Sequence, residues 1–262
     1  MTIKISLGQM DVKFGDPDAN LATVTRMTEE AKRLGSDAII FPELWSTGYD
    51  LTRAGNYASD LTSGLFADLS TLAARTGIHL LGSTLSLLAE NRFGNTLSVF
   101  SPEGKLLADY SKTHLFRLMD EEKYLTAGDR PILVDLPFAR AGLAICYDLR
   151  FPELFRGYAL AGADMVFLPS EWPHPRLSHW QTLVRARAIE NQIFMVAVNR
   201  VGRDASNEFF GHSMVVDPWG EILAEGEEGE ELITVELDPL KVQEARRKIP
   251  ILQDRRPDVY RV

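Results

Sequence analysis

The sequence of 262 residues contains a single cysteine, Cys146, and therefore lacks any possible internal disulfide. A fold without disulfides does not depend on an oxidising compartment, and a reactive thiol is best preserved in a reducing one. The sequence also lacks an apolar run of membrane-spanning length, and Lys4, Asp11 and Lys13 interrupt its start before the apolar region of a signal peptide could form. These absences predict a cytoplasmic protein without a membrane partner.

Basic residues are in deficit, because 28 Lys and Arg stand against 37 Asp and Glu, which gives a formal net charge of −9. A nucleic-acid-binding surface needs clustered Lys and Arg, so the acidic excess argues against nucleic acid as a partner. The densest acidic run, residues 225–231, is typical of a solvated turn. His174 and His179 are five residues apart with Pro175 between them, a spacing that common zinc sites do not use, and we expect no metal.

No low-complexity linker divides the chain, and we expect one domain over residues 1–262. Hydrophobic residues make up 45% of the chain, which is enough for a sizeable core. Strand and helix patterns alternate, beginning with a β-α-β unit within residues 3–41. The pattern predicts an α/β fold with a mixed sheet. Further helices are expected at residues 61–76 and 180–191, and further strands at 79–85, 95–100, 106–110, 163–168, 193–198, 209–216 and 232–237.

Cys146 lies between an apolar stretch that ends at Ile145 and a helix that begins near Pro152. A turn from strand to helix exposes the side chain and directs the following backbone N–H groups into the same space, as an acyl-transfer nucleophile requires. A lone cysteine in an apolar run is more often inert core. An acid and a base also follow strands, however: Glu43 after residues 37–41 and Lys112 after residues 108–111. An acid, a base and a thiol at three strand ends predict a catalytic site.

Each of these residues also has a simpler interpretation. On residue type alone, Glu43 would be a surface carboxylate and Lys112 a lysine that protects a sheet edge. Apolar neighbours disfavour an ionised carboxylate, however, and move it toward the range useful for a general base. His114 leaves open a Cys–His pairing or a structural imidazole. The strands that end at residues 168 and 198 are also followed by polar residues, so Glu171, Trp172 and Asn199 are expected at the opening of the same site. Residues 44–56 are expected to form a loop that could overhang this opening.

Three segments resemble the signature blocks of the nitrilase superfamily of carbon–nitrogen hydrolases. They are residues 41–43, 110–115 and 145–153, and the resemblance extends over nearly the whole chain. It implies a four-layer α-β-β-α sandwich with mixed sheets, and a homodimer or higher oligomer that packs through its helical faces. Residues 240–262 resemble the C-terminal extension that packs against a partner subunit in this family. The apolar residues Ile249 and Tyr260 support such docking.

The resemblance also implies roles for the site residues. Glu43 accepts the proton of Cys146, the thiolate attacks an amide carbonyl, and Lys112 and the backbone N–H of Tyr147 hold the oxyanion. Ammonia leaves, and water hydrolyses the thioester without a metal or organic cofactor. A second glutamate supports Lys112, and counting back from residues 127–129 places it at Glu121, or at Glu122 if the register slips by one. Tyr49, Tyr147 and Trp172 are the expected substrate-binding residues.

The substrate is expected to be a small amide. Segments 172–173, 187–192 and 254–258 resemble omega-amidases, which deamidate small 2-oxo-dicarboxylic monoamides such as 2-oxoglutaramate. A general short-chain aliphatic amidase, an N-carbamoyl amino acid amidohydrolase and a true nitrilase are the alternatives within the family. A non-catalytic binding member, or a cysteine protease that uses His114 or His212, remains the alternative from another class.

Overall fold

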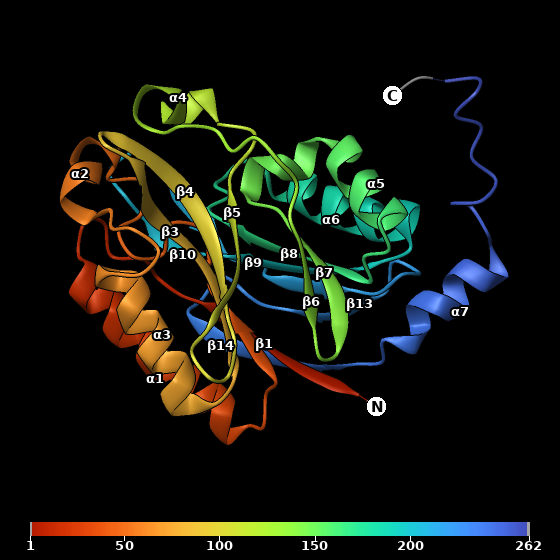
Figure 1. Ribbon diagram of the computed structural model, residues 1–262, viewed down its shortest axis with the longest axis horizontal. Helices are drawn as coiled ribbons and strands as arrows, with labels where there is room; N and C mark the ends of the chain where they lie inside the picture. The colour runs from red at the N-terminus through yellow and green to blue at the C-terminus, as the bar shows by residue number, and fades with distance from the viewer. Residues whose placement is uncertain (1, 261–262) are drawn as a thin grey trace.

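Two six-stranded mixed sheets form the centre of the computed structural model, which describes residues 2–260 (Figure 1). In each sheet three neighbouring strands are parallel and the outer pairs are antiparallel. The first sheet has the order β14 (Glu231–Leu237), β1 (Ile3–Gln9), β2 (Ala38–Ile40), β3 (His79–Ala89), β4 (Arg92–Phe100) and β5 (Leu106–Ser111). The second has the order β13 (Ile222–Glu225), β12 (Met214–Val216), β9 (Phe194–Asn199), β8 (Met165–Ser170), β7 (Ala139–Leu143) and β6 (Leu133–Leu136).

Helices cover the outer face of each sheet (Figure 1). Alternate residues of β2 point to opposite faces: Ile39 packs with α1 and α3, and Ile40 belongs to the core between the two sheets. The same cluster of buried residues continues through the second sheet to α5 and α6, which cover the other face of that sheet (Figure 1). The layers are therefore helix, sheet, sheet and helix, as expected. The longer helices are α1 (Pro17–Arg33), α3 (Gly64–Thr76), α5 (Pro152–Leu160), α6 (Leu177–Asn191) and α7 (Leu240–Lys248).

Local sequence signals explain where the first helices begin and end. Asp16 caps α1 by accepting a hydrogen bond from the backbone N–H of Ala19, and Pro17 takes the first helical position, where it needs no donor. Gly77 ends α3 in the left-handed conformation, with φ 66°, which favours glycine. The remaining short helices are α2 (Ala54–Tyr57), α4 (Glu121–Tyr124) and the 3-10 helices η1 (Leu51–Arg53), η2 (Arg117–Met119) and η3 (Cys146–Arg150).

The sequence predicted one continuous strand at residues 209–216, and this prediction was wrong. Gly211 and His212 have φ angles of 69° and 51°, and this left-handed backbone breaks the strand in two. The first part, β11 (Glu208–Phe210), pairs with β10 (Val201–Arg203) in a separate two-stranded sheet, and the second part is β12. Strand β6 at the edge of the second sheet was not anticipated. The strands at 95–100 and 106–110 do pair antiparallel as predicted.

Residues 240–248 of the C-terminal extension form α7, whose Val242 and Ala245 are buried against the rest of the chain. The following segment exposes apolar side chains, including Val259 at 68%. Residues 261 and 262 of the predicted extension lie outside the described part of the chain. Across residues 2–260, no helix has the length and apolar character that crossing a membrane requires.

Candidate active site

Cys146 stands at a sharp turn between β7 and α5. Its φ of 44° is unusual for a residue other than glycine and costs roughly 1–3 kcal/mol, which the surrounding structure must supply. Buried Asp148 supplies part of it, since its Oδ2 accepts hydrogen bonds from the backbone N–H of Ile145 at 2.9 Å and from the hydroxyl of Tyr110 at 2.8 Å. Pro152 then opens α5. The predicted strand-to-helix turn is therefore present and is tied to β5 through Tyr110.

Glu43 follows β2 and is completely buried. Its Oε1 accepts hydrogen bonds from Lys112 Nζ and from Asn95 Nδ2, both at 2.7 Å. Its Oε2 accepts one from the backbone N–H of Glu171 at 2.9 Å. Residues after the carboxyl ends of β2, β5 and β8 thus converge on one carboxylate together with Asn95 of the antiparallel strand β4, because the carboxyl ends of parallel strands in both sheets meet at one edge of the sandwich.

Lys112 is also completely buried, and its ammonium lies between two carboxylates. Nζ donates to Glu43 Oε1 at 2.7 Å and to Glu121 Oε1 at 2.6 Å. Burial alone lowers the pKa of Lys112, but Glu121 and then Glu43 outweigh it and raise that pKa well above its usual value. Lys112 therefore stays positively charged over the whole working range of pH.

Glu121 opens α4 and is buried, whereas Glu122 is exposed. Besides Lys112, Glu121 accepts hydrogen bonds from the hydroxyl of Tyr49 at 2.6 Å and from the backbone N–H of Phe116 at 2.7 Å. Burial raises the pKa of Glu121, Lys112 opposes the rise, and Glu43 adds to it. Of the two glutamates that the sequence left open, Glu121 is the one beside Lys112.

Cys146 is 5% exposed, and its Sγ lies 3.9 Å from the backbone carbonyl oxygen of Glu171. Burial and then the negative charge of Glu43 raise the pKa of Cys146 well above its usual value, while Lys112 opposes the rise. The resting thiol is therefore protonated, and a nucleophilic thiolate requires that a neighbouring base take the proton.

A pocket opens onto this thiol. Tyr147 and Trp172 line it, as expected for substrate-binding residues. Tyr49 is not among the lining residues, because its hydroxyl points to Glu121. The complete lining is Phe116, Cys146, Tyr147, Arg150, Glu171, Trp172, Pro173 and Arg176.

Sequence reasoning missed Arg150 and Arg176 as pocket residues. The Arg150 guanidinium lies 4.9 Å from the ring centroid of Trp172, and that of Arg176 lies 5.8 Å from the ring of Phe116. Across residues 2–260 neither guanidinium forms an ion pair with a carboxylate. The sequence did contain a signal for Arg150 as a site residue, because Arg150 lies within the block that carries Cys146.

The histidines that the protease alternative requires make other contacts. The ring of His114 stacks on Phe151, and its Nδ1 lies 2.7 Å from Asp148 Oδ1. His212 Nδ1 lies 2.9 Å from Glu225 Oε1. Over the described range 2–260, neither forms a hydrogen bond with Cys146, and no cluster of three His, Cys, Asp or Glu side chains could hold a metal ion.

A four-layer α-β-β-α sandwich, with a buried thiol, a lysine and a glutamate that follow strands and a second glutamate at the start of α4, defines a cysteine-dependent hydrolase of the nitrilase type. Residues 4–247 match the family model of carbon–nitrogen hydrolases, and the chain belongs to this family. It is an amidohydrolase that cleaves carbon–nitrogen bonds through a cysteine intermediate.

Several characterised proteins are similar to this chain. It is 38% identical to the 2-oxoglutaramate amidase of Bacillus subtilis, and the match covers 98% of each chain. The structure of a CN-hydrolase superfamily protein from Xanthomonas campestris, with an arsenic adduct in its active site, is 32% identical, with a TM-score of 0.91 over 98% of each chain. A mutant amidase from Nesterenkonia carries the acetamide moiety of fluoroacetamide on its active-site cysteine; it is 28% identical with a TM-score of 0.88, over 99% of this chain and 96% of that one.

Proposed function

We propose that this enzyme is an omega-amidase, which hydrolyses the terminal amide of a small 2-oxo-dicarboxylic monoamide such as 2-oxoglutaramate. The observation that carries the proposal is the pair Arg150 and Arg176, which lines the pocket beside Cys146 and has no carboxylate partner among residues 2–260. Such a substrate has a carboxylate at the end away from its amide, and guanidinium groups bind carboxylates with charge-assisted hydrogen bonds. Similarity to a 2-oxoglutaramate amidase also supports it.

In the proposed reaction Cys146 is the nucleophile and Glu43 the general base. Glu43 accepts the thiol proton, Sγ forms a bond to the amide carbon, and the carbonyl electron pair moves onto oxygen. Lys112 Nζ and the backbone N–H of Tyr147 stabilise that oxyanion, and one such donor is worth about 3 kcal/mol. The carbon–nitrogen bond then breaks as Glu43 returns its proton to nitrogen, and ammonia leaves.

Water completes the proposed cycle. Glu43 accepts a proton from water, the resulting hydroxide attacks the thioester carbon, and the carbon–sulfur bond breaks to regenerate the thiol and release the carboxylic acid. Glu121 holds the Lys112 ammonium in place, because a buried ammonium is stable only beside carboxylates. We assign Tyr49 the role of orienting Glu121, and Tyr147 and Trp172 the role of enclosing the substrate.

Ammonia release from a panel of substrates tests this function. The panel contains 2-oxoglutaramate, an N-carbamoyl amino acid, propionamide and propionitrile, each with and without a chelator. We expect 2-oxoglutaramate to give the highest kcat/KM and the chelator to have no effect. Preference for propionamide would assign a general short-chain amidase, preference for the carbamoyl compound an N-carbamoyl amino acid amidohydrolase, and no turnover of any compound would refute amide hydrolysis by this site.

Variants of the pocket arginines test the carboxylate contact directly. Arg176→Met removes one charged donor, and hydrogen bonds to charged groups are worth about 1.5–3 kcal/mol, so kcat/KM for 2-oxoglutaramate should fall by roughly 10- to 100-fold. The rate with propionamide, which has no carboxylate, should be unchanged. Arg117→Met, an exposed arginine outside the pocket lining, is the matched control. Equal losses of kcat/KM with both substrates would show that Arg176 does not bind the substrate carboxylate.

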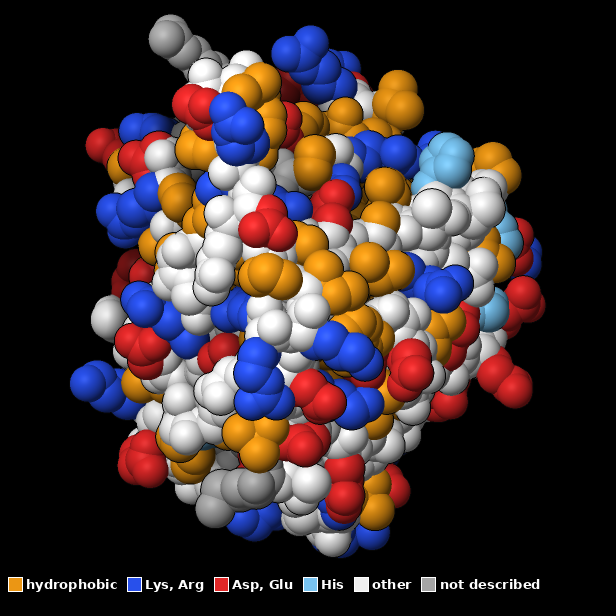
Figure 2. Space-filling model, turned by 90° about the vertical axis from the view of Figure 1, so that its right-hand side faces the viewer, with side chains coloured by type: hydrophobic (Ala, Val, Ile, Leu, Met, Phe, Trp, Pro, Cys, Tyr) orange, Lys and Arg blue, Asp and Glu red, His pale blue; other side chains and the backbone are white. Residues whose placement is uncertain are grey.

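We also propose a closed homodimer of one-domain subunits, in which residues 240–262 pack against the partner. The side of the molecule with α5, α6 and the C-terminal segment faces the viewer in Figure 2, and hydrophobic side chains lie among charged ones there. Leu160 and Ile189 are each 47% exposed on that side, and Ile249 is 48% exposed. Such residues need a surface to cover them. The single thiol supports a reducing, cytoplasmic location.

A further inference from the structure

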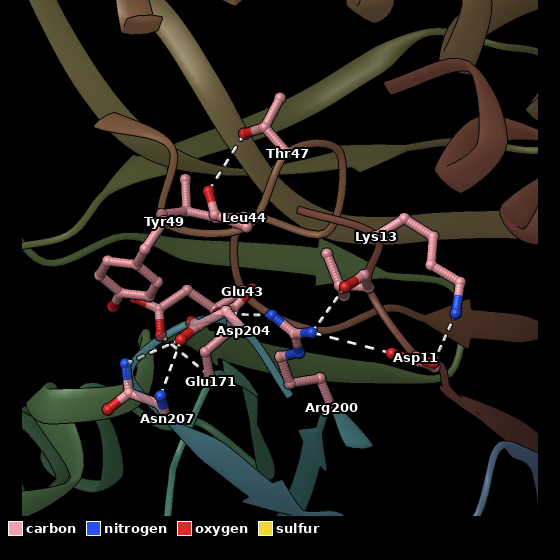
Figure 3. Close-up of polar contacts among 12 residues, drawn as sticks. Asp11, Lys13, Glu43, Leu44, Thr47, Tyr49, Glu171, Arg200, Asp204 and Asn207 are labelled. Atoms are coloured by element: carbon pink, nitrogen blue, oxygen red, sulfur yellow. Dashed lines mark hydrogen bonds and ion pairs between the residues drawn. The ribbon is translucent and has the colours of Figure 1, made fainter. Parts of the chain in front are cut away.

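Glu171 and Arg200 form a buried ion pair beside the candidate active site, and the proposed reaction gives their side chains no role. They follow β8 and β9, which are neighbouring parallel strands. Arg200 Nη1 lies 3.2 Å from Glu171 Oε2, and both side chains are completely buried (Figure 3). A buried ion pair is costly to desolvate and contributes little net stability, so its presence at this place calls for another explanation.

The backbone of Glu171 contacts both reacting groups. Its N–H donates to Glu43 Oε2 at 2.9 Å, and its carbonyl oxygen lies 3.9 Å from Cys146 Sγ. These two groups flank one Cα, so rotation about the φ and ψ of Glu171 would move them relative to the base and the thiol. Fixing the side chain on that Cα therefore restricts both contacts.

Arg200 is itself held from several sides. Its Nη2 donates to the backbone carbonyl of Val12 at 2.6 Å, and its Nε donates to that of Val201 at 3.2 Å. Its guanidinium lies 4.3 Å from the ring centroid of Phe209. These contacts come from the loop after β1 and from β10 and β11, so Glu171 is anchored to a rigid part of the fold rather than to a free side chain.

The loop after Glu43 closes over this pair. Gly48 has a φ of 60°, and a Cβ there would lie 3.4 Å from Arg200 Nη1 and 3.7 Å from Glu171 Oε1. The next residue, Tyr49, donates to Glu121. The backbone of this loop therefore packs directly on the ion pair while its tyrosine reaches the carboxylate that holds Lys112.

We propose that the Glu171–Arg200 pair is a positioning device that holds the backbone of Glu171 against Glu43 and Cys146, and so orients the base toward the thiol. This inference rests on the proposed roles of Glu43 and Cys146. Glu171 and Arg200 are positioning residues, since they act through the backbone groups of Glu171 and not on the substrate.

Electrostatics indicates which property of Glu171 matters. Burial raises the pKa of Glu171 to about 8, with Arg200 opposing the rise and Glu43 adding to it. Glu171 Oε2 accepts a hydrogen bond from Arg200 Nη1 at 3.2 Å whether or not the carboxyl is ionised, so the hydrogen bond, rather than the charge, is the property that positions Glu171. Glutamine has the same shape, is neutral and offers the same carbonyl acceptor, so it should replace Glu171, whereas alanine should not.

The experiment compares Glu171→Ala with Glu171→Gln at neutral pH. Misplacement of reacting groups by about 1 Å can cost roughly 100-fold, so we expect Glu171→Ala to lower kcat by roughly 10- to 100-fold with little change in KM. Because Cys146 is the only cysteine, the rate of alkylation by iodoacetamide reports on the same geometry without substrate, and it should fall in parallel. Glu171→Gln should restore both rates to within about threefold of the wild type.

Controls separate positioning from stability. Asp217→Asn disrupts another ion pair, between buried Asp217 and the partly exposed Lys241, in the turn after β12 at the other end of the second sheet. It should lower Tm without changing alkylation. Wild-type kcat and alkylation in Glu171→Ala would overturn the proposal, as would a Glu171→Gln variant as slow as the alanine variant.

A second variant covers the case in which Glu171→Ala does not fold. Arg200→Lys keeps the charge, but an ammonium cannot reproduce the planar fork that spans Glu171, Val12 and Val201. Its alkylation should slow by roughly tenfold or more, and a wild-type rate would overturn the proposal. Turnover that survives Cys146→Ala would instead refute the proposed reaction, whatever the alkylation rates show.

Discussion

Replacing Lys112 with methionine removes the cation whose Nζ lies 2.7 Å from Glu43 Oε1 and 2.6 Å from Glu121 Oε1. Breaking a buried ion pair by removing one partner costs about 3–5 kcal/mol. For a chain of this size, 1 kcal/mol shifts Tm by about 2–4 °C, so Lys112→Met should lower Tm by about 6–20 °C. Loss of an oxyanion donor should also lower kcat by about 10²–10³-fold, with a much smaller change in KM.

The stability loss of Lys112→Met should depend on pH. Burial already raises the pKa of Glu121, and without Lys112 to oppose it that pKa rises further. The folded variant then binds more protons than the unfolded chain, whose glutamate pKa is about 4.3, so its stability falls as pH rises above that value. The difference in Tm between variant and wild type should therefore shrink toward pH ~4.5 and grow toward neutral pH.

Calorimetry at several pH values and steady-state kinetics with propionamide measure the two effects separately. Lys123→Met is the matched control and should change neither quantity, because Lys123 is an exposed lysine of α4 that pairs with Asp120 just before that helix. A folded Lys112→Met variant with turnover near the wild type would show that Lys112 is not an oxyanion donor. If turnover is lost but Tm is unchanged, the buried carboxylates Glu43 and Glu121 do not need Lys112 for the stability of the fold, and that part of the prediction is refuted.

The remaining predictions concern the other site residues and the assembly. Cys146→Ala should abolish detectable ammonia release, and iodoacetamide should inactivate the wild type in proportion to modification; a tenth of the wild-type rate in the variant, roughly, would exclude Cys146 as nucleophile. Glu43→Gln should lower kcat by about 10²–10⁴-fold while the Tm, measured beside it, verifies folding. Light scattering should show a dimer at micromolar concentration, and deletion of residues 249–262 should weaken it. A monomeric wild type would contradict the proposed interface.

The alternation of elements and the polar residues after strands could be recognised in the sequence, because strand period, proline at a helix start and glycine at a helix end are local signals. They predicted an α/β fold with a mixed sheet, whereas the four layers came only from the resemblance to the family. They also selected Glu43, Lys112 and Cys146, which the structure brings together. The strand break at Gly211 and His212 was not predicted, because a histidine gives no local signal for a left-handed backbone.

The sequence by itself determined which residues follow the strands. These residues then come together, because the carboxyl ends of parallel strands meet at one edge wherever such a sheet forms. Only the tertiary structure decided their partners. Glu171 reaches Glu43 across 128 residues and Arg200 reaches Val12 across 188, and no local pattern encodes such contacts. The tertiary structure also decided that Glu121, and not its neighbour Glu122, pairs with Lys112. A buried ammonium needs a carboxylate partner, and the packing of α4 turns Glu121 inward.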